Sequence, residues 1–177
     1  MKEALVALNK ACESGVIDGY AIGGAIGASF YIEAVNTEDV DAFVFLTPPA
    51  ESALITLTPL YDELIRLGGV VENEYIRFGS WPVQILPAYK PLVEEAIFNA
   101  VEVLFGDIKT KVFTAEYLCA IALDTGRIKD YYRVAMFIEQ SAVNLDELEV
   151  LVDRFELQER VRHVQNWPEK HNIQKPR

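Results

Sequence analysis

The stretch that decides the fold is residues 21–46, AIGGAIGASFYIEAVNTEDVDAFVFL. A short apolar strand over Tyr20–Ile22 leads into Gly23 and Gly24, and a helix is predicted over Ala25–Glu33. Backbone N–H groups at the start of such a helix bind phosphate oxygens without help from a basic side chain. Because glycine has no side chain, the turn also lets a ligand approach the backbone closely. The pattern therefore predicts a phosphate site at the two glycines.

Two aspartates follow the predicted helix. Asp39 and Asp41 are two residues apart at the entry to a strand predicted over Val40–Leu46, so their side chains project from the same face. Two carboxylates beside a phosphate site suit Mg²⁺, and they repel each other unless a cation is present. The alternative is an ordinary turn followed by solvated acids. The glycine spacing G-G-x-x-G differs from the G-x-G-x-x-G of dinucleotide-binding folds.

The rest of the chain predicts an α+β protein with a mixed sheet flanked by helices. Further helices are expected at 3–14, 52–67 and 92–100, further strands at 70–75, 83–86, 101–105 and 111–113, and turns at 36–37 and 48–49. From Thr114, the threonine N-cap of a helix ending at 125–126, the pattern is helical, with more helices at 127–140, 145–155 and 157–164. We expect a core over 1–113, a helical extension packed on it over 114–166, and a flexible tail over 167–177.

The composition limits the possible functions. Half of the 177 residues are apolar, but no apolar run is long enough to span a bilayer, and residues 1–15 do not resemble a signal peptide. We therefore expect a cytoplasmic protein without a membrane partner. The net charge is −11, and residues 1–153 hold 10 Lys+Arg against 24 Asp+Glu, which argues against broad contact with a nucleic-acid backbone. Cys12 and Cys119 lie in apolar helical segments and predict reduced thiols.

Two motifs resemble known families. The hydrophobic-Gly-Gly turn, the helix and the segment Thr37-Glu38-Asp39-Val40-Asp41 resemble the nucleotidyltransferase signature of the DNA polymerase β superfamily. Ala115-Glu116-Tyr117-Leu118, followed by the sequence GRIKDY at 126–131, is similar to the helical stretch of AbiEii-type nucleotidyltransferases, a group that includes toxins of toxin–antitoxin systems. Together the two resemblances span about residues 20–135, and they imply a nucleotidyltransferase core with appended helices.

The resemblance also implies a role for each motif residue. Gly23 and Gly24 would hold the phosphates of an NTP, and Asp39 and Asp41 would bind Mg²⁺ and carry the catalysis. The residues that would line the rim of the nucleotide cleft are Arg127, Lys129 and Asp130. The alternative for this second group is a helix–helix corner in which the basic residues only pair with nearby acids.

The chain departs from the families' pattern at two positions. The third carboxylate, often the general base, is expected on the strand that contains VQIL, where this sequence has Gln84. Glu72 or Glu74, taken as sharing one face of the preceding strand, could replace it. The AbiEii-type pattern places a phosphate-binding lysine about one turn before Gly126, where this chain has Ala122.

Three interpretations follow from the sequence. The first is a transferase that moves a nucleoside monophosphate from Mg·NTP to a hydroxyl on a protein, an RNA or a small molecule. The second is a degenerate relative that binds a nucleotide or a partner without catalysis. The third is a structural α+β domain that carries the motif by chance. The base of the NTP, the acceptor and the oligomeric state stay open at this stage.

Overall fold

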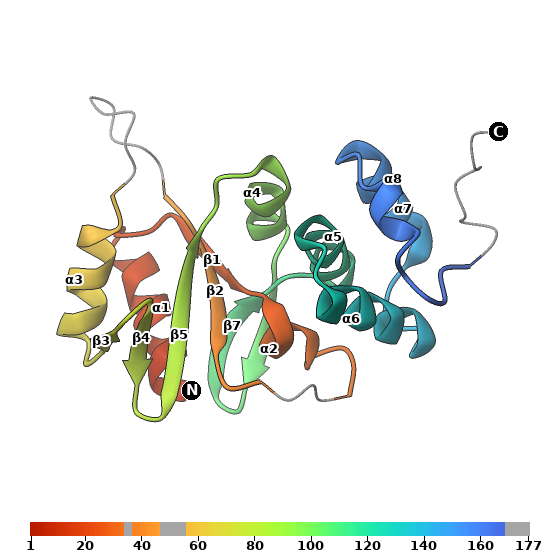
Figure 1. Cartoon of the computed structure of the whole chain (residues 1–177). Coiled ribbons are helices and arrows are strands. Elements are labelled where there is room, and N and C mark those ends of the chain that lie inside the picture. The colour runs from red at the N-terminus through yellow and green to blue at the C-terminus, as the bar shows by residue number, and fades with distance from the viewer. Residues whose placement is uncertain (34–36, 47–55, 169–177) are drawn as a thin grey trace. The chain divides into compact units, whose positions relative to one another are not determined.

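The computed structural model describes residues 1–33, 37–46 and 56–168. Its centre is a seven-stranded mixed sheet with the order β3-β4-β5-β2-β1-β7-β6 (Figure 1). The strands are β1 Gly19–Ile22, β2 Val40–Phe45, β3 Val70–Glu72, β4 Tyr75–Phe78, β5 Trp81–Pro87, β6 Val101–Phe105 and β7 Ile108–Val112. The helices are α1 Lys2–Glu13, α2 Gly24–Ala28, α3 Thr58–Arg66, α4 Pro91–Phe98, α5 Ala115–Thr125, α6 Ile128–Glu139, α7 Leu145–Arg154 and α8 Gln158–Val161. The predicted α+β class is confirmed.

The strand β2 lies at the centre of the sheet. It pairs antiparallel with β1 and parallel with β5. Its side chains alternate between a fully buried face, formed by Val40, Ala42 and Val44, and a half-exposed face with Asp41 and Phe43. This alternation follows from the pleat of a strand, and it sends the aspartate away from the apolar core.

Two helical layers cover the sheet within the core. The helices α1 and α3 pack against each other on one side, and α4 lies on the other side (Figure 1). The ring of Phe98 in α4 meets the ring of Phe45 on β2 at a centroid distance of 5.0 Å. The largest fully buried side chains around β1 and β4 include Leu5, Leu8 and Ile76. These contacts fix the strands that carry the candidate site.

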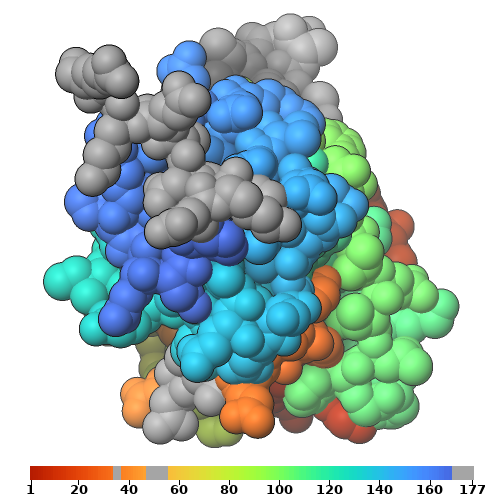
Figure 2. Space-filling view, turned by 90° about the vertical axis from the view of Figure 1, so that its right-hand side faces the viewer, coloured from red at the N-terminus to blue at the C-terminus, as the bar shows by residue number. Residues whose placement is uncertain are grey.

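The chain folds into two compact units. The first comprises residues 1–27 and 36–113, and the second comprises 28–35 and 114–177. The second unit is built from α5, α6 and α7, with Phe137 fully buried, and Figure 2 views the face on which its residues, coloured cyan to blue, are exposed. Trp167 is buried, although the sequence placed it in the tail.

The helix after the two glycines is shorter than predicted. It ends at Ala28 instead of Glu33, and the chain continues in turns whose first amides, those of Tyr31 and Ile32, donate to the Ala28 carbonyl oxygen at 2.9 and 3.0 Å. The ring of Tyr31 lies 6.1 Å from that of Phe137 in the second unit. Tertiary packing of bulky side chains therefore overrides the helical periodicity here.

The strand pattern over residues 70–113 also differs from the prediction. Asn73, at φ 55°, breaks the predicted strand 70–75 into β3 and β4, so the segment forms one more strand than expected. The strand predicted at 111–113 begins earlier in the structure, as β7, which ends at Val112 and lies inside the sheet between β1 and β6. The predicted turns at 36–37 and 48–49 and the start of the predicted helix 52–67 lie wholly or partly outside the described residues, as does most of the predicted tail.

Candidate functional site

One row of paired residues runs across neighbouring strands of the core. Asp41 on β2 is paired in register with Gln84 on β5, and Gln84 is paired with Tyr75 on β4. On the other side, the Gly23 amide donates to the Asp41 carbonyl oxygen at 3.0 Å, directly after the end of β1. Residues paired across strands project to the same face of a sheet. The side chains of Tyr75, Gln84 and Asp41 therefore share one face, and all three are half-buried.

Gly24 lies against the Asp41 carboxylate. Its φ of +56° is in the left-handed region, which glycine adopts without a steric penalty. A Cβ atom at this position would come within 1.7 Å of the Asp41 Oδ2 atom. The carboxylate thus occupies the space beside the backbone of the turn, and only glycine leaves that space free.

Gly23 has a different neighbourhood. A Cβ atom there would lie 2.5 Å from the Cε2 atom of Phe43 and 3.0 Å from that of Phe113, two rings whose centroids are 5.0 Å apart. Its amide is already bonded to the strand β2. Gly23 therefore allows the turn to pack on the aromatic pair, whereas Gly24 faces the acidic group. The sequence pattern predicted the same role for both glycines, whereas their neighbours in the structure differ.

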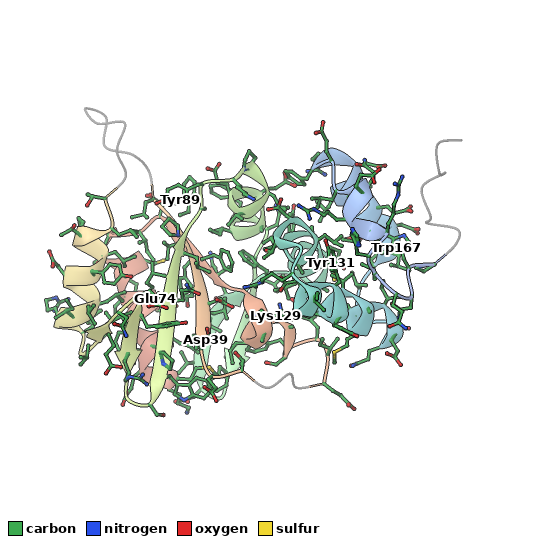
Figure 3. All side chains as sticks on the ribbon, viewed as in Figure 1. Asp39, Glu74, Tyr89, Lys129, Tyr131 and Trp167 are labelled. Atoms are coloured by element: carbon green, nitrogen blue, oxygen red, sulfur yellow. The ribbon has the colours of Figure 1, made fainter. Side chains whose placement is uncertain are left out.

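Asp39 directly precedes the strand β2 and is half-buried. The Thr37 hydroxyl donates a hydrogen bond to its Oδ1 atom at 2.9 Å and also lies 3.3 Å from its main-chain oxygen. Figure 3 shows Asp39 at the lower end of the sheet and Tyr89 towards the upper end. The threonine orients the first of the two predicted carboxylates at the entry to the strand.

The possible replacements for the third carboxylate are arranged differently from the prediction. Glu72 ends β3 and forms an ion pair with Arg77 at 2.7 Å, while Glu74 lies in the turn between β3 and β4. The two glutamates therefore do not share one face of a strand, because Asn73 bends the chain between them. The position beside Asp41 on the next parallel strand is that of Gln84, whose amide is neutral at every physiological pH.

Tyr75 is a candidate site residue that sequence reasoning missed. Its pKa is raised by desolvation and by the negative charges of Asp39, Glu74 and Asp41, in that order. The phenol is therefore within electrostatic reach of both predicted metal ligands. Little in the sequence indicated this role. Tyr75 comes into the row only because Asn73 and Glu74 form a hairpin turn between β3 and β4, and the sequence pattern predicted a single strand there.

The donor set agrees with the chemistry of Mg²⁺. Among the residues that the structure describes, no group of three or more His, Cys, Asp or Glu side chains gathers as a metal cage. Mg²⁺ is commonly held by one or two carboxylates, with water and substrate phosphates completing the coordination. Asp39 and Asp41 are oxygen donors of the type that Mg²⁺ takes, and the Asp41 carboxylate lies against Gly24.

The predicted basic residues belong to the second unit. Asp130 is 1% exposed and accepts from the Arg127 Nε atom at 2.6 Å and from Arg133 Nη1 at 3.3 Å. Arg127 and Asp130 form the capping box of α6, so this carboxylate is committed to the fold. Lys129 projects from the same turn and is exposed. Ala122, where a lysine was expected, is buried in α5.

Comparisons with known proteins support the fold. No protein-family model and no curated protein matches the chain. Among solved structures, the chain is similar to the solution structure of the antibiotic-resistance factor ANT(2'')-Ia, with a TM-score of 0.52 and 16% identity over 88% of this chain and 93% of that one. It is also similar to an antigenic nucleotidyltransferase-like protein from Paracoccidioides brasiliensis, with a TM-score of 0.51 and 16% identity over 92% of each chain.

A third similar structure is a complex. ANT(2")-Ia bound to adenylyl-2"-tobramycin matches with a TM-score of 0.50 and 15% identity, covering 87% of this chain and 96% of that one. At these identities the similarity concerns architecture. The chain therefore has the nucleotidyltransferase fold. Among its described residues, no helix is both long and apolar enough to span a membrane.

Proposed function

We propose that this chain is a Mg²⁺-dependent nucleotidyltransferase that moves a nucleoside monophosphate from an NTP to a hydroxyl acceptor. The observation that carries the proposal is the position of the Asp41 carboxylate over Gly24 in a nucleotidyltransferase fold. The glycine turn would hold the phosphates, and the carboxylates would meet the charge of a cation that accompanies them.

The reaction balances without another reactant. The acceptor oxygen forms a bond to the α-phosphorus, the bond from that phosphorus to the bridging oxygen of the β-phosphate breaks, and pyrophosphate leaves while the hydroxyl proton goes to solvent. Asp39 and Asp41 would hold Mg²⁺, which supplies charge neutralisation and Lewis acidity when bound. Thr37 would keep Asp39 oriented, and Gly24 would let the phosphates approach the backbone.

In the second unit, the residues proposed to contact the nucleotide carry positive charge. Arg127, whose side chain is 59% exposed, and Lys129 would contact phosphate, and the buried Asp130 would hold Arg127 in position. Charge-assisted bonds of this kind are the strong ones in phosphate recognition. Gly23 would contribute by packing, because it brings the turn against the aromatic pair.

The class of acceptor is proposed more broadly. A solved structure with the same fold holds adenylyl-2"-tobramycin, which makes a small hydroxyl compound one option. The AbiEii-like segments 115–118 and 126–131 make a protein or RNA partner in a toxin–antitoxin pair another. An acidic protein of charge −11 favours acceptors that carry positive charge.

The test is transfer of label from α-³²P-NTPs in the presence of Mg²⁺, combined with thermal melts. We expect Mg·NTP to raise the melting temperature of the wild-type chain, and we expect Asp39→Ala and Asp41→Ala to abolish both that shift and the label transfer. Glu102→Ala, in an exposed ion pair on β6, is a matched control that should leave both unchanged. An unchanged shift in both aspartate variants would contradict the proposed site.

A second candidate function is nucleotide binding without turnover. Gln84 favours it, because a neutral amide stands beside Asp41 where a general base would be expected. Gln84→Asp separates the two candidates. If the wild type binds Mg·NTP but transfers nothing and Gln84→Asp transfers label, the natural chain is a binding protein. Transfer by the wild type establishes the enzyme.

A further inference from the structure

Tyr75 is the hydroxyl-bearing residue in the row of strand-paired residues that contains Asp41. It stands two strands from Asp41, in the same row and on the same face, with Gln84 between them. Neighbouring strands are about 4.8 Å apart, so the two Cα atoms are separated by roughly 10 Å across the row. The Tyr75 side chain therefore lies on the same face of the sheet as Asp41, with the Gln84 side chain between them.

The charges around Tyr75 agree with this placement. Desolvation and the negative charges of Asp39, Glu74 and Asp41 raise the pKa of the Tyr75 phenol, so both predicted metal ligands act on it electrostatically. Gln84, the residue that separates Tyr75 from Asp41, offers an amide, which is a poor nucleophile. Tyr75 is half-buried on the sheet, so part of the residue is exposed to solvent.

We propose that Tyr75 is itself an acceptor, and that the chain attaches a nucleoside monophosphate to its own Tyr75 hydroxyl. The inference rests on the proposed function. The Tyr75 Oη atom forms a bond to the α-phosphorus of the NTP, the bond from the α-phosphorus to the bridging oxygen breaks, and pyrophosphate leaves. The phenolic proton goes to solvent. The product is a phosphodiester between the tyrosine and the nucleoside, on the site's own face.

Other tyrosines of the core lack this position. Tyr89 is 66% exposed but follows the far end of β5, at the opposite end of the sheet from Asp39 (Figure 3). Tyr20 is buried, and its hydroxyl bonds Asn9 at 2.6 Å and lies 3.0 Å from that of Thr110. Tyr89 is therefore a matched control, because its hydroxyl is more accessible but distant from the row.

The experiment uses the full chain incubated with MgCl₂ and each of the common NTPs, followed by intact-mass measurement and peptide mapping. We expect the mass to increase by one nucleoside monophosphate, with the added group on the peptide that contains Tyr75. Tyr75→Phe and Asp41→Asn should remove the added mass, and Tyr89→Phe should retain it. Because attack within one molecule is first order, the rate per molecule should not change across a dilution series.

The outcomes distinguish this inference from the proposed function. If Mg·NTP raises the melting temperature of the wild type but no mass is added, or if the group maps to another residue, self-modification of Tyr75 is wrong and the nucleotide site stands. If neither a thermal shift nor added mass is found, both fail. Peptide mapping of the wild type identifies the modified residue even if Tyr75→Phe does not fold.

Discussion

At the scale of single residues, the candidate site depends on the space that the absent side chains of two glycines leave for neighbouring groups. Gly24 leaves the space that Asp41 fills, and Gly23 leaves the space that Phe43 fills. The two neighbouring glycines therefore serve the site and the core respectively. Thr37 orients Asp39 by a hydrogen bond, which reduces the freedom of a carboxylate that would otherwise be solvated. The contacts of Gly24 and Thr37 thus position carboxylate oxygen atoms before any ligand arrives.

Gly24→Ala should damage both stability and the site. Alanine at φ +56° costs about 1–2 kcal/mol, and its Cβ atom would displace the Asp41 carboxylate. We expect a lower melting temperature and loss of the shift induced by Mg·NTP. Gly15→Ala is the matched control, because Gly15 has a φ of +71° and no heavy atom within 4 Å of the Cβ position. A normal ligand-induced shift in Gly24→Ala would show that Asp41 does not need this space.

At the scale of elements, one hairpin turn in the first unit and one capping box in the second position the candidate side chains. The β3–β4 turn at Asn73 brings Tyr75 into register with Gln84. In the second unit, the capping box of α6 buries Asp130 between Arg127 and Arg133. The arginine pair is thereby held at the start of the helix by a carboxylate that solvent does not reach.

Asp130→Ala should destabilise the helical unit strongly. Removal of a buried carboxylate leaves Arg133, whose side chain is 12% exposed, without its ion-pair partner, a change that typically costs about 3–5 kcal/mol. We expect this loss in the free energy of unfolding measured with urea. Glu159→Ala is the control, because it removes an i,i+3 pair with Arg162 whose carboxylate is 75% exposed, and such pairs contribute less than about 1 kcal/mol. Equal losses in the two variants would contradict the assigned role of Asp130.

At the scale of the whole molecule, negative charge dominates. The chain carries 27 acidic and 16 basic side chains, and the acidic excess lies before residue 154. Self-repulsion in such a chain opposes the compact state, and salt or bound cations reduce that repulsion.

Increasing NaCl at constant pH should therefore raise the melting temperature of the wild type. The effect arises from general screening, so Asp39→Ala and Asp41→Ala should retain it although they lose the Mg·NTP response. Differential scanning calorimetry over a series of NaCl concentrations provides the measurement. A melting temperature that falls as salt is added would indicate that favourable ion pairs outweigh the repulsion.

The sequence by itself determined the α+β class, the strand β2 and the acidic pair at its start, because strand and helix periodicity and a two-residue spacing are local properties. Tertiary structure alone decided that α2 ends at Ala28, that Asn73 splits a strand, and that Asp41, Gln84 and Tyr75 form one row. A register joins residues distant along the chain, and it depends on turns and packing that no local pattern encodes. The spacing of Asp39 and Asp41 predicted a metal pair beside the glycine turn, whereas the fold showed that Gly24 lies against Asp41 and that Tyr75 lies two strands away in the same row.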